Sequence, residues 1–152
     1  MELADGAPYI EDVRGLIREY TEWFGRDLAF QGLDDELEHV GDKYLPPEGR
    51  LIVALDDGGA VVGCVAYHRL DDATAEMKRL YVRPAFRGSG LGSLLVDRII
   101  ADAREIGYRQ MLLDTLPPLE SAIRMYRALG FYEIPCYNDS PVDETIFLCL
   151  DL

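Results

Sequence analysis

Residues 76–92 read EMKRLYVRPAFRGSGLG, and the rest of the chain is interpreted outward from them. The run Ala75–Val82 predicts a strand that ends before Pro84. Arg87–Gly92 holds three glycines and leads directly into a long helical pattern. Glycines let a backbone approach a ligand closely, and a helix N-terminus offers unpaired N–H groups and a positive dipole end. The stretch therefore predicts a phosphate-binding loop between a strand and a helix.

Two common phosphate loops fit this segment poorly. A Walker A loop requires Lys and then Ser or Thr after its last glycine, but here Gly92 is followed by Ser93 and Leu94. A Rossmann fingerprint requires Gly or Ala at its final position, where this chain has Ser93. A third pattern, Arg/Gln-x-x-Gly-x-Gly/Ala, binds the pyrophosphate of acyl-CoA in N-acyltransferases. Arg87–Gly92 matches it in full.

Charge is distributed unevenly along the chain. The formal net charge is −13, which disfavours nucleic acid and anionic membranes as partners of the surface as a whole. Residues 77–98 nevertheless contain five basic residues and one acidic residue. A basic island in an acidic protein indicates a local site for an anion, although a solvated strand and helix end would look the same.

Helical and strand patterns alternate in the remaining sequence. We expect helices over Asp12–Phe24, Leu33–Val40, Leu91–Gly107 and Leu119–Leu129. We expect strands over Leu51–Leu55, Ala60–His68, Ala75–Val82, Gln110–Leu113, Phe131–Ile134 and Thr145–Leu150. Hairpins mixed with strand–helix–strand crossovers predict an α/β (α+β) fold with a mixed sheet. At 152 residues, 49% of them apolar, we expect one domain over residues 1–152.

Other reactive residues form no pattern of their own. Cys64, Cys136 and Cys149 are odd in number and widely spaced, so we expect free thiols in the cytoplasm and no metal site. His39 and His68 have no catalytic partner at a recognisable spacing. No run approaches the ~20 apolar residues of a membrane span, and residues 1–10 do not resemble a secretory signal.

The chain resembles the GNAT (Gcn5-related N-acetyltransferase) superfamily. The resemblance rests on Glu76–Pro84 followed by Phe86–Gly92, and on a second string, Ala122–Phe131, which is similar to the family's late helix and the strand after it. It implies a mixed, mostly antiparallel central sheet with flanking helices. It also implies a central strand that is bulged and splayed from its neighbour.

The resemblance implies how acetyl-CoA would bind. Backbone groups of Leu80, Tyr81 and Val82 would pair with the pantetheine arm. Main-chain N–H groups of the loop would hold the pyrophosphate, and the loop residues are Arg87, Gly88, Ser89, Gly90, Leu91 and Gly92. Where the family often has an Asn that contacts the cofactor arm, this chain has Leu119. Ser121 or a water would then take the place of that contact.

Two residues are implied as catalytic. Tyr126 matches the family tyrosine that assists the departing thiolate, and its alternative is a core aromatic. Glu76 is the candidate base that removes a proton from the attacking amine, directly or through water. Its alternative is an edge carboxylate paired with Lys78 or Arg79.

The acceptor site is implied by position. Phe30, Gln31 and Tyr44 lie in the segment that forms one wall of the acceptor pocket in this fold. Asp114 ends the strand predicted over Gln110–Leu113 and would help to bind a cationic amine; its alternative is a cap or turn residue. The implied reaction is direct attack by a primary amine, carried by a small molecule or an amino acid. A protein lysine or N-terminal amine as acceptor, and a non-catalytic acyl-CoA sensor, remain alternatives. The strands after Gly130 are where such folds pair as homodimers.

Overall fold

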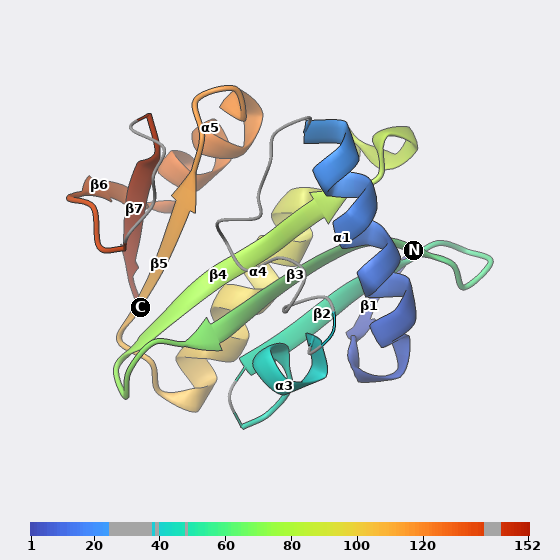
Figure 1. The fold of residues 1–152 in the computed structure, drawn as a ribbon, viewed down its shortest axis with the longest axis horizontal. Coiled ribbons are helices and arrows are strands. Elements are labelled where there is room, and N and C mark those ends of the chain that lie inside the picture. The colour runs from blue at the N-terminus through green and yellow to red at the C-terminus, as the bar shows by residue number, and fades with distance from the viewer. Residues whose placement is uncertain (25–37, 39, 48, 139–143) are drawn as a thin grey trace.

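The computed structural model describes residues 1–24, 38, 40–47, 49–138 and 144–152, which form a sheet covered by helices (Figure 1). Its helices are η1 (Ala7–Tyr9), α1 (Ile10–Phe24), α3 (Val40–Tyr44), η3 (Pro84–Phe86), α4 (Leu91–Ile106) and α5 (Glu120–Leu129). Its strands are β1 (Glu2–Asp5), β2 (Gly49–Leu55), β3 (Val61–Arg69), β4 (Thr74–Val82), β5 (Gln110–Thr115), β6 (Tyr132–Ile134) and β7 (Ile146–Asp151). No helix among these is long and apolar enough to cross a membrane.

The sheet is mixed, as the sequence patterns predict, and mostly antiparallel, as the family resemblance implies. Its strands follow the order β1-β2-β3-β4-β5-β7-β6. Within the described sheet, β4 and β5 are parallel, whereas every other neighbouring pair is antiparallel. The parallel pair is connected by α4, because two parallel strands require a crossover rather than a hairpin.

Apolar cores lie on both faces of the sheet. α4 covers one face, where Leu95 and Ile99 are fully buried in a cluster with Ile52 of β2. α1 and α3 cover the other face, where Leu16 belongs to a cluster with Leu51 of β2. Successive side chains of a strand point to opposite faces, so a strand that is buried on both sides must be apolar throughout. This explains why β2 reads as an uninterrupted apolar run after Arg50.

Two N-terminal elements differ from the sequence prediction. The sequence does not predict β1, because ELAD has no apolar run, and its strand conformation comes from pairing with β2. The sequence predicts a helix that ends at Val40, but α3 extends past Gly41 to Tyr44. Tyr44 is fully buried, so packing against the sheet outweighs the poor helix propensity of Gly41. Most of the predicted Leu33–Val40 helix lies outside the described residues.

Gly49 permits the close approach of α3 to the edge of the sheet. A Cβ atom at this position would lie 2.4 Å from the Tyr67 carbonyl oxygen and 2.6 Å from the Lys43 carbonyl oxygen. Both contacts are with backbone, which cannot rotate away as a side chain can. Gly49 is also the β2 residue opposite His68, so its close packing positions one residue of the site described below.

We predict that Gly49→Ala lowers the free energy of unfolding by about 1–3 kcal/mol, because the added methyl group forces the backbone apart. Denaturant titration measures the change. Gly15→Ala is the matched control, because Gly15 lies in α1 and a methyl group added there would have nothing within 4 Å. The control should raise stability by about 0.5–1 kcal/mol through helix propensity. Equal stability of Gly49→Ala and the wild type would contradict the packing argument.

Candidate active site

β4 and β5 part soon after they begin. Their parallel register joins residues 74–76 to residues 110–112, and the strands then diverge (Figure 1). The splayed arrangement predicted for the central strand is therefore present. Backbone groups in the second half of β4 have no ladder partner on the β5 side within the described sheet.

A β-bulge lies in β4 just beyond the point of divergence. The β3–β4 register pairs Lys78 with Ala66. The next registered pair joins Tyr81 to Cys64, so β4 has one residue more than β3 between the two pairs. Arg79 adopts a φ of 62° there, and it is the non-glycine residue with positive φ among those described. Its carbonyl oxygen accepts a hydrogen bond from the Cys64 thiol at 3.2 Å.

The bulge reverses the face of the sheet toward which each following side chain of β4 points. A one-residue insertion exchanges the two faces of every following residue. Leu80 and Val82 consequently pack toward the α4 side. Tyr81 turns toward α1, where its hydroxyl donates a hydrogen bond of 2.8 Å to Glu19 Oε2. The bulge thus fixes both the exposed strand edge and the contact with α1.

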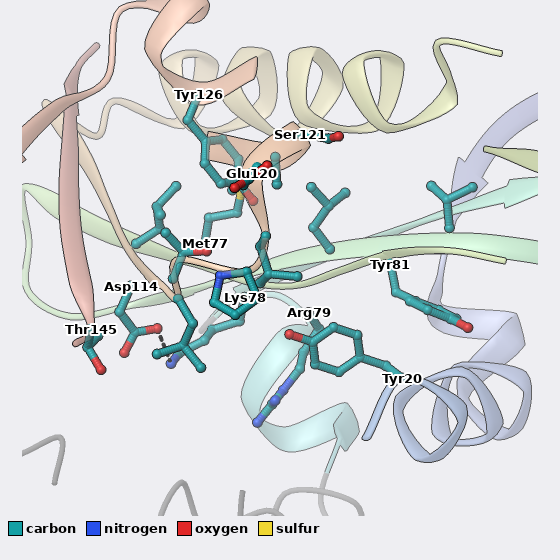
Figure 2. A pocket seen from close by; sticks show the side chains of 18 of the residues that line it. Tyr20, Met77, Lys78, Arg79, Tyr81, Asp114, Glu120, Ser121, Tyr126 and Thr145 are labelled. Atoms are coloured by element: carbon teal, nitrogen blue, oxygen red, sulfur yellow. Dashed lines mark hydrogen bonds and ion pairs between the residues drawn. The ribbon is translucent and has the colours of Figure 1, made fainter. Parts of the chain in front are cut away.

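A pocket of about 390 Å³ occupies the space between the diverging strands (Figure 2). Its walls are residues 77–82 of β4, residues 113–115 of β5, residues 118–122 around the start of α5, and Tyr20 of α1. Tyr126 and Arg87 also line it. Leu119, which stands where the family often has its Asn, lines this pocket, and so does Ser121.

The glycine-rich loop leads from β4 into α4. Gly88 and Gly90 have φ values of 80° and 82°, so both occupy the left-handed region that favours glycine. α4 begins after Gly90 without a capping side chain, and the first N–H groups of a helix have no partner within it. The Arg87 guanidinium donates to the Val82 carbonyl oxygen at 2.9 Å and lies 5.5 Å from the Tyr81 ring centroid. The loop therefore has the geometry of an anion site.

Tyr126 reaches the pocket from α5, on the side opposite Tyr20 and Arg79 (Figure 2). Its side chain is only 6% exposed and packs on Phe131, with ring centroids 5.5 Å apart. Burial, together with the nearby Tyr20, raises the pKa of Tyr126 above its ordinary value. The hydroxyl therefore stays protonated at any ordinary pH and can donate a hydrogen bond to a group in the pocket.

Glu76 lies behind the pocket wall and accepts two short hydrogen bonds. His68 Nε2 is 2.6 Å from Oε1, and the Tyr137 hydroxyl is 2.5 Å from Oε2. Lys78 Nζ lies 3.8 Å from Oε1. Burial alone would raise the pKa of Glu76, but the His68 hydrogen bond, the Lys78 charge and the Tyr137 hydrogen bond outweigh it and lower this pKa to about 2. The carboxylate is therefore ionised and weakly basic.

Lys78 also connects Glu76 to Asp114. Lys78 Nζ lies 3.4 Å from Asp114 Oδ1 (Figure 2). Asn138 Nδ2 donates to Asp114 Oδ2 at 3.0 Å. Asp114 lines the pocket, and both of its carboxylate oxygens already have partners. Tyr137 and Asn138 thus attach the segment after β6 to the ends of β4 and β5.

The other predicted acceptor residues are placed differently. Phe30 and Gln31 lie outside the described residues. Tyr44 does not line the pocket, which differs from its predicted place on an acceptor wall. It is buried between α3 and the sheet, and its ring meets the His68 ring edge-on at a centroid distance of 6.2 Å.

Several residues of the site are not predicted from the sequence. His68 could be found from the β3–β4 hairpin, because it is the direct cross-strand neighbour of Glu76. Tyr20 continues the helical spacing of apolar residues in the helix predicted over Asp12–Phe24, and this spacing favours a place in the core. Tyr137 and Asn138 have no local signal, because they contact β4 and β5 only in the folded chain.

The comparisons with known proteins agree with this geometry. The model of the acetyltransferase (GNAT) family matches residues 14–131. An uncharacterized N-acetyltransferase of Schizosaccharomyces pombe is 43% identical over 144 residues, which is 94% of this chain and 88% of the relative.

Solved structures show the same fold. A GNAT-family acetyltransferase from Staphylococcus aureus superimposes with a TM-score of 0.82 at 22% identity, covering 99% of this chain and 98% of that one. A GNAT-family acetyltransferase from Elizabethkingia anophelis, solved with acetyl-CoA bound, has a TM-score of 0.61 at 22% identity and covers 76% and 83%. The bulge, the diverging strands and the glycine-rich loop thus occur in a chain that belongs to the acetyltransferase (GNAT) family.

Proposed function

We propose that this protein transfers the acetyl group of acetyl-CoA to the primary amine of a small molecule or an amino acid. The observation that carries the proposal is the continuous path from the glycine-rich loop, along the second half of β4, to Tyr126. An anion site, the part of β4 that does not pair with β5, and a proton donor lie along it in that order. This is the order of pyrophosphate, pantetheine and thioester in acetyl-CoA.

Main-chain groups would supply most of the grip on acetyl-CoA. The N–H groups of Arg87–Gly92 would hold the pyrophosphate at the start of α4, where the helix dipole also favours negative charge. Leu80, Tyr81 and Val82 would pair through their backbones with the amides of the pantetheine arm. This pairing resembles the addition of a strand to a sheet edge, which is available because β5 has diverged.

The reaction is a direct transfer within the pocket. The amine nitrogen attacks the thioester carbonyl carbon, a C–N bond forms and the C–S bond breaks. The amine loses a proton, and the sulfur leaves as a thiolate that is finally protonated. A thiol has a pKa near 8.5, well below that of Tyr126, so complete proton transfer from Tyr126 is unfavourable. We therefore assign Tyr126 a hydrogen bond that stabilises the leaving thiolate.

Glu76 is poorly suited to remove the amine proton directly. A carboxylate with a pKa of about 2, whose two oxygens already accept hydrogen bonds, is a weak base. Of the two routes predicted from the sequence, we favour the one through water. In this role a water molecule accepts the proton of the amine, and the negative charge of Glu76 stabilises the positive charge that this proton brings to the water. Binding and orientation of the two substrates supply much of the rate in any case.

A screen of acetyl transfer across an amine panel tests the proposal. Release of free CoA from acetyl-CoA is measured with small amines, amino acids and lysine-containing peptides. Transfer to the small amines or amino acids supports the proposal. Transfer confined to the peptides would support a protein acceptor. Binding of acetyl-CoA without transfer to any amine would indicate a sensor.

We predict that Gly90→Val weakens acetyl-CoA binding at least 10-fold. A β-branched side chain resists positive φ and would project where the pyrophosphate approaches. Gly59→Val is the matched control, because Gly59 also has positive φ (85°) and open space but lies in the β2–β3 turn. Both variants should lose similar stability, whereas only Gly90→Val should lose affinity in calorimetric titration. Unchanged affinity of Gly90→Val for acetyl-CoA would mean that the loop does not bind the cofactor.

We predict that Tyr126→Phe lowers kcat roughly 10- to 100-fold with little change in KM for acetyl-CoA. A hydrogen bond to a charged group contributes about 1.5–3 kcal/mol, and this one strengthens as the thiolate forms. Tyr67→Phe is the control, because the Tyr67 hydroxyl is buried outside the pocket without a hydrogen-bond partner among the described residues. Steady-state kinetics decide the matter. A wild-type kcat for Tyr126→Phe would mean that Tyr126 is a core aromatic residue without a catalytic role.

We predict that Glu76→Gln lowers kcat, and that the factor by which kcat falls is the same at every pH between 6 and 9. With a pKa of about 2, Glu76 is fully ionised throughout that range, so its loss cannot have a pH-dependent effect there. A loss of kcat concentrated at low pH would mean that Glu76 titrates as a base in the working enzyme.

The pH dependence of the free energy of unfolding is a second, independent measurement on Glu76. Because the folded pKa lies below the ordinary value of 4.5, the stabilisation is present above pH 4.5 and lost as pH falls toward 2. In Glu76→Gln the free energy of unfolding should fall less steeply than in the wild type between pH 4.5 and pH 2.

A further inference from the structure

α5 begins at the wall of the pocket without a capping side chain. Its N-cap residue is Leu119, whose side chain has no acceptor atom and makes no capping hydrogen bond. The Ile123 N–H donates to the Leu119 carbonyl oxygen at 3.0 Å, and the helical ladder starts with this bond. The N–H groups that precede it, at Glu120, Ser121 and Ala122, have no acceptor within the helix. Each of these residues lines the pocket.

The Tyr126 side chain extends toward this end of α5. Side chains of a helix lean toward its N-terminus, and residues four apart share a face, so the Tyr126 ring covers the turn that holds Ala122. Figure 2 shows the ring extending toward Glu120. Tyr126 is only 6% exposed, yet its hydroxyl has no hydrogen-bond partner among the described residues. A buried donor without a partner, facing a pocket at the start of a helix, indicates that a bound group accepts there.

The acetyl-CoA path brings sulfur to this place. The pyrophosphate would lie at the start of α4, and the thioester would lie at the other end of the path, beside Tyr126. The sulfur gains negative charge when the C–S bond breaks. The positive end of a helix dipole favours negative charge, and hydrogen bonds to a charged acceptor are stronger than those to a neutral one. The donors at the start of α5 therefore suit the thiolate better than the thioester.

We propose that the N–H groups at the start of α5, together with the Tyr126 hydroxyl, bind the thiolate of CoA. This inference rests on the proposed path of acetyl-CoA and adds a second set of donors for its leaving group. As the amine nitrogen forms the C–N bond, the electron pair of the breaking C–S bond stays on the sulfur. The donors of α5 stabilise that charge until the sulfur is protonated.

Other ionisable groups around the pocket also act on the sulfur. Glu120 stands in the first turn of α5 and is exposed, and its negative charge opposes formation of the thiolate. The ionisable side chains on the remaining walls are Tyr20, Lys78, Arg79, Arg87 and Asp114. Variants confined to α5 leave all of these unchanged, so a comparison among such variants isolates the contribution of the helix.

Titration of bound CoA tests the proposal independently of turnover. The NMR signal of CoA that is isotope-labelled beside its sulfur reports formation of the thiolate, with the protein in excess and no amine present. Donors that stabilise the thiolate lower the pKa of the thiol. In the wild type this pKa should lie roughly 0.5–1.5 below that of free CoA.

Two substitutions of Glu120 separate the N–H group from the charge. Glu120→Pro removes one N–H at the start of α5, where proline is tolerated, and should move the pKa of the bound thiol back toward the value of free CoA. Glu120→Ala is the matched control, because it removes the same negative charge and keeps the N–H. Its bound thiol should have a pKa equal to or lower than that in the wild type.

Tyr126→Phe is a second variant, and it decides the matter even where Glu120→Pro fails to fold. With the hydroxyl removed and the helix start intact, the pKa of the bound thiol should lie between those of the wild type and free CoA. A value equal to that of free CoA would overturn the proposal. So would an unshifted pKa in the wild type, or equal values in folded Glu120→Pro and Glu120→Ala. A lowered pKa without acetyl transfer to any amine would count against the proposed transfer alone, whereas failure of the wild type to bind CoA would overturn both.

Discussion

The extra residue in β4 is the constraint on which the site depends. Without it, Tyr81 would face α4 instead of Glu19 on α1, and the side chains of Leu80 and Val82 would also change faces. The bulge also lies just past the last paired residue of β4 and β5, where the ladder between them ends. One local insertion therefore produces the strand edge, the pocket beside it and the contact that holds α1 over both.

The charges behind the pocket have a structural role in addition to any chemical one. Glu76 and Asp114 are largely buried, and buried carboxylates require partners. Lys78 lies between them, and Tyr137 and Asn138 each donate a hydrogen bond to one of them. The segment after β6 is thereby attached to the two strands where they part. The position of this segment consequently depends on the ionisation of the carboxylates and not on apolar packing alone.

Local patterns made much of the fold predictable. The glycine-rich loop could be recognised because its glycines, positive φ values and helix start are all set within a few residues. The long apolar runs identified the central strands for the same reason. The pairing of His68 with Glu76 depends on register, and the contact of Tyr137 with Glu76 joins residues 61 positions apart. The bulge was expected from the resemblance, but arginine at its left-handed position gives no local sign of it.

The net charge of the chain and the charge of the site act over different distances. A chain with a charge of −13 repels an anionic cofactor, yet at physiological ionic strength that repulsion is screened beyond about 8 Å. Arg87 and the start of α4 lie next to where the phosphates would bind, within the range that salt does not screen. Acidic residues elsewhere can therefore keep the surface soluble without weakening the anion site. The charge of the whole chain disfavours anionic partners that bind broad surfaces, whereas a ligand in a pocket responds to the few groups around it.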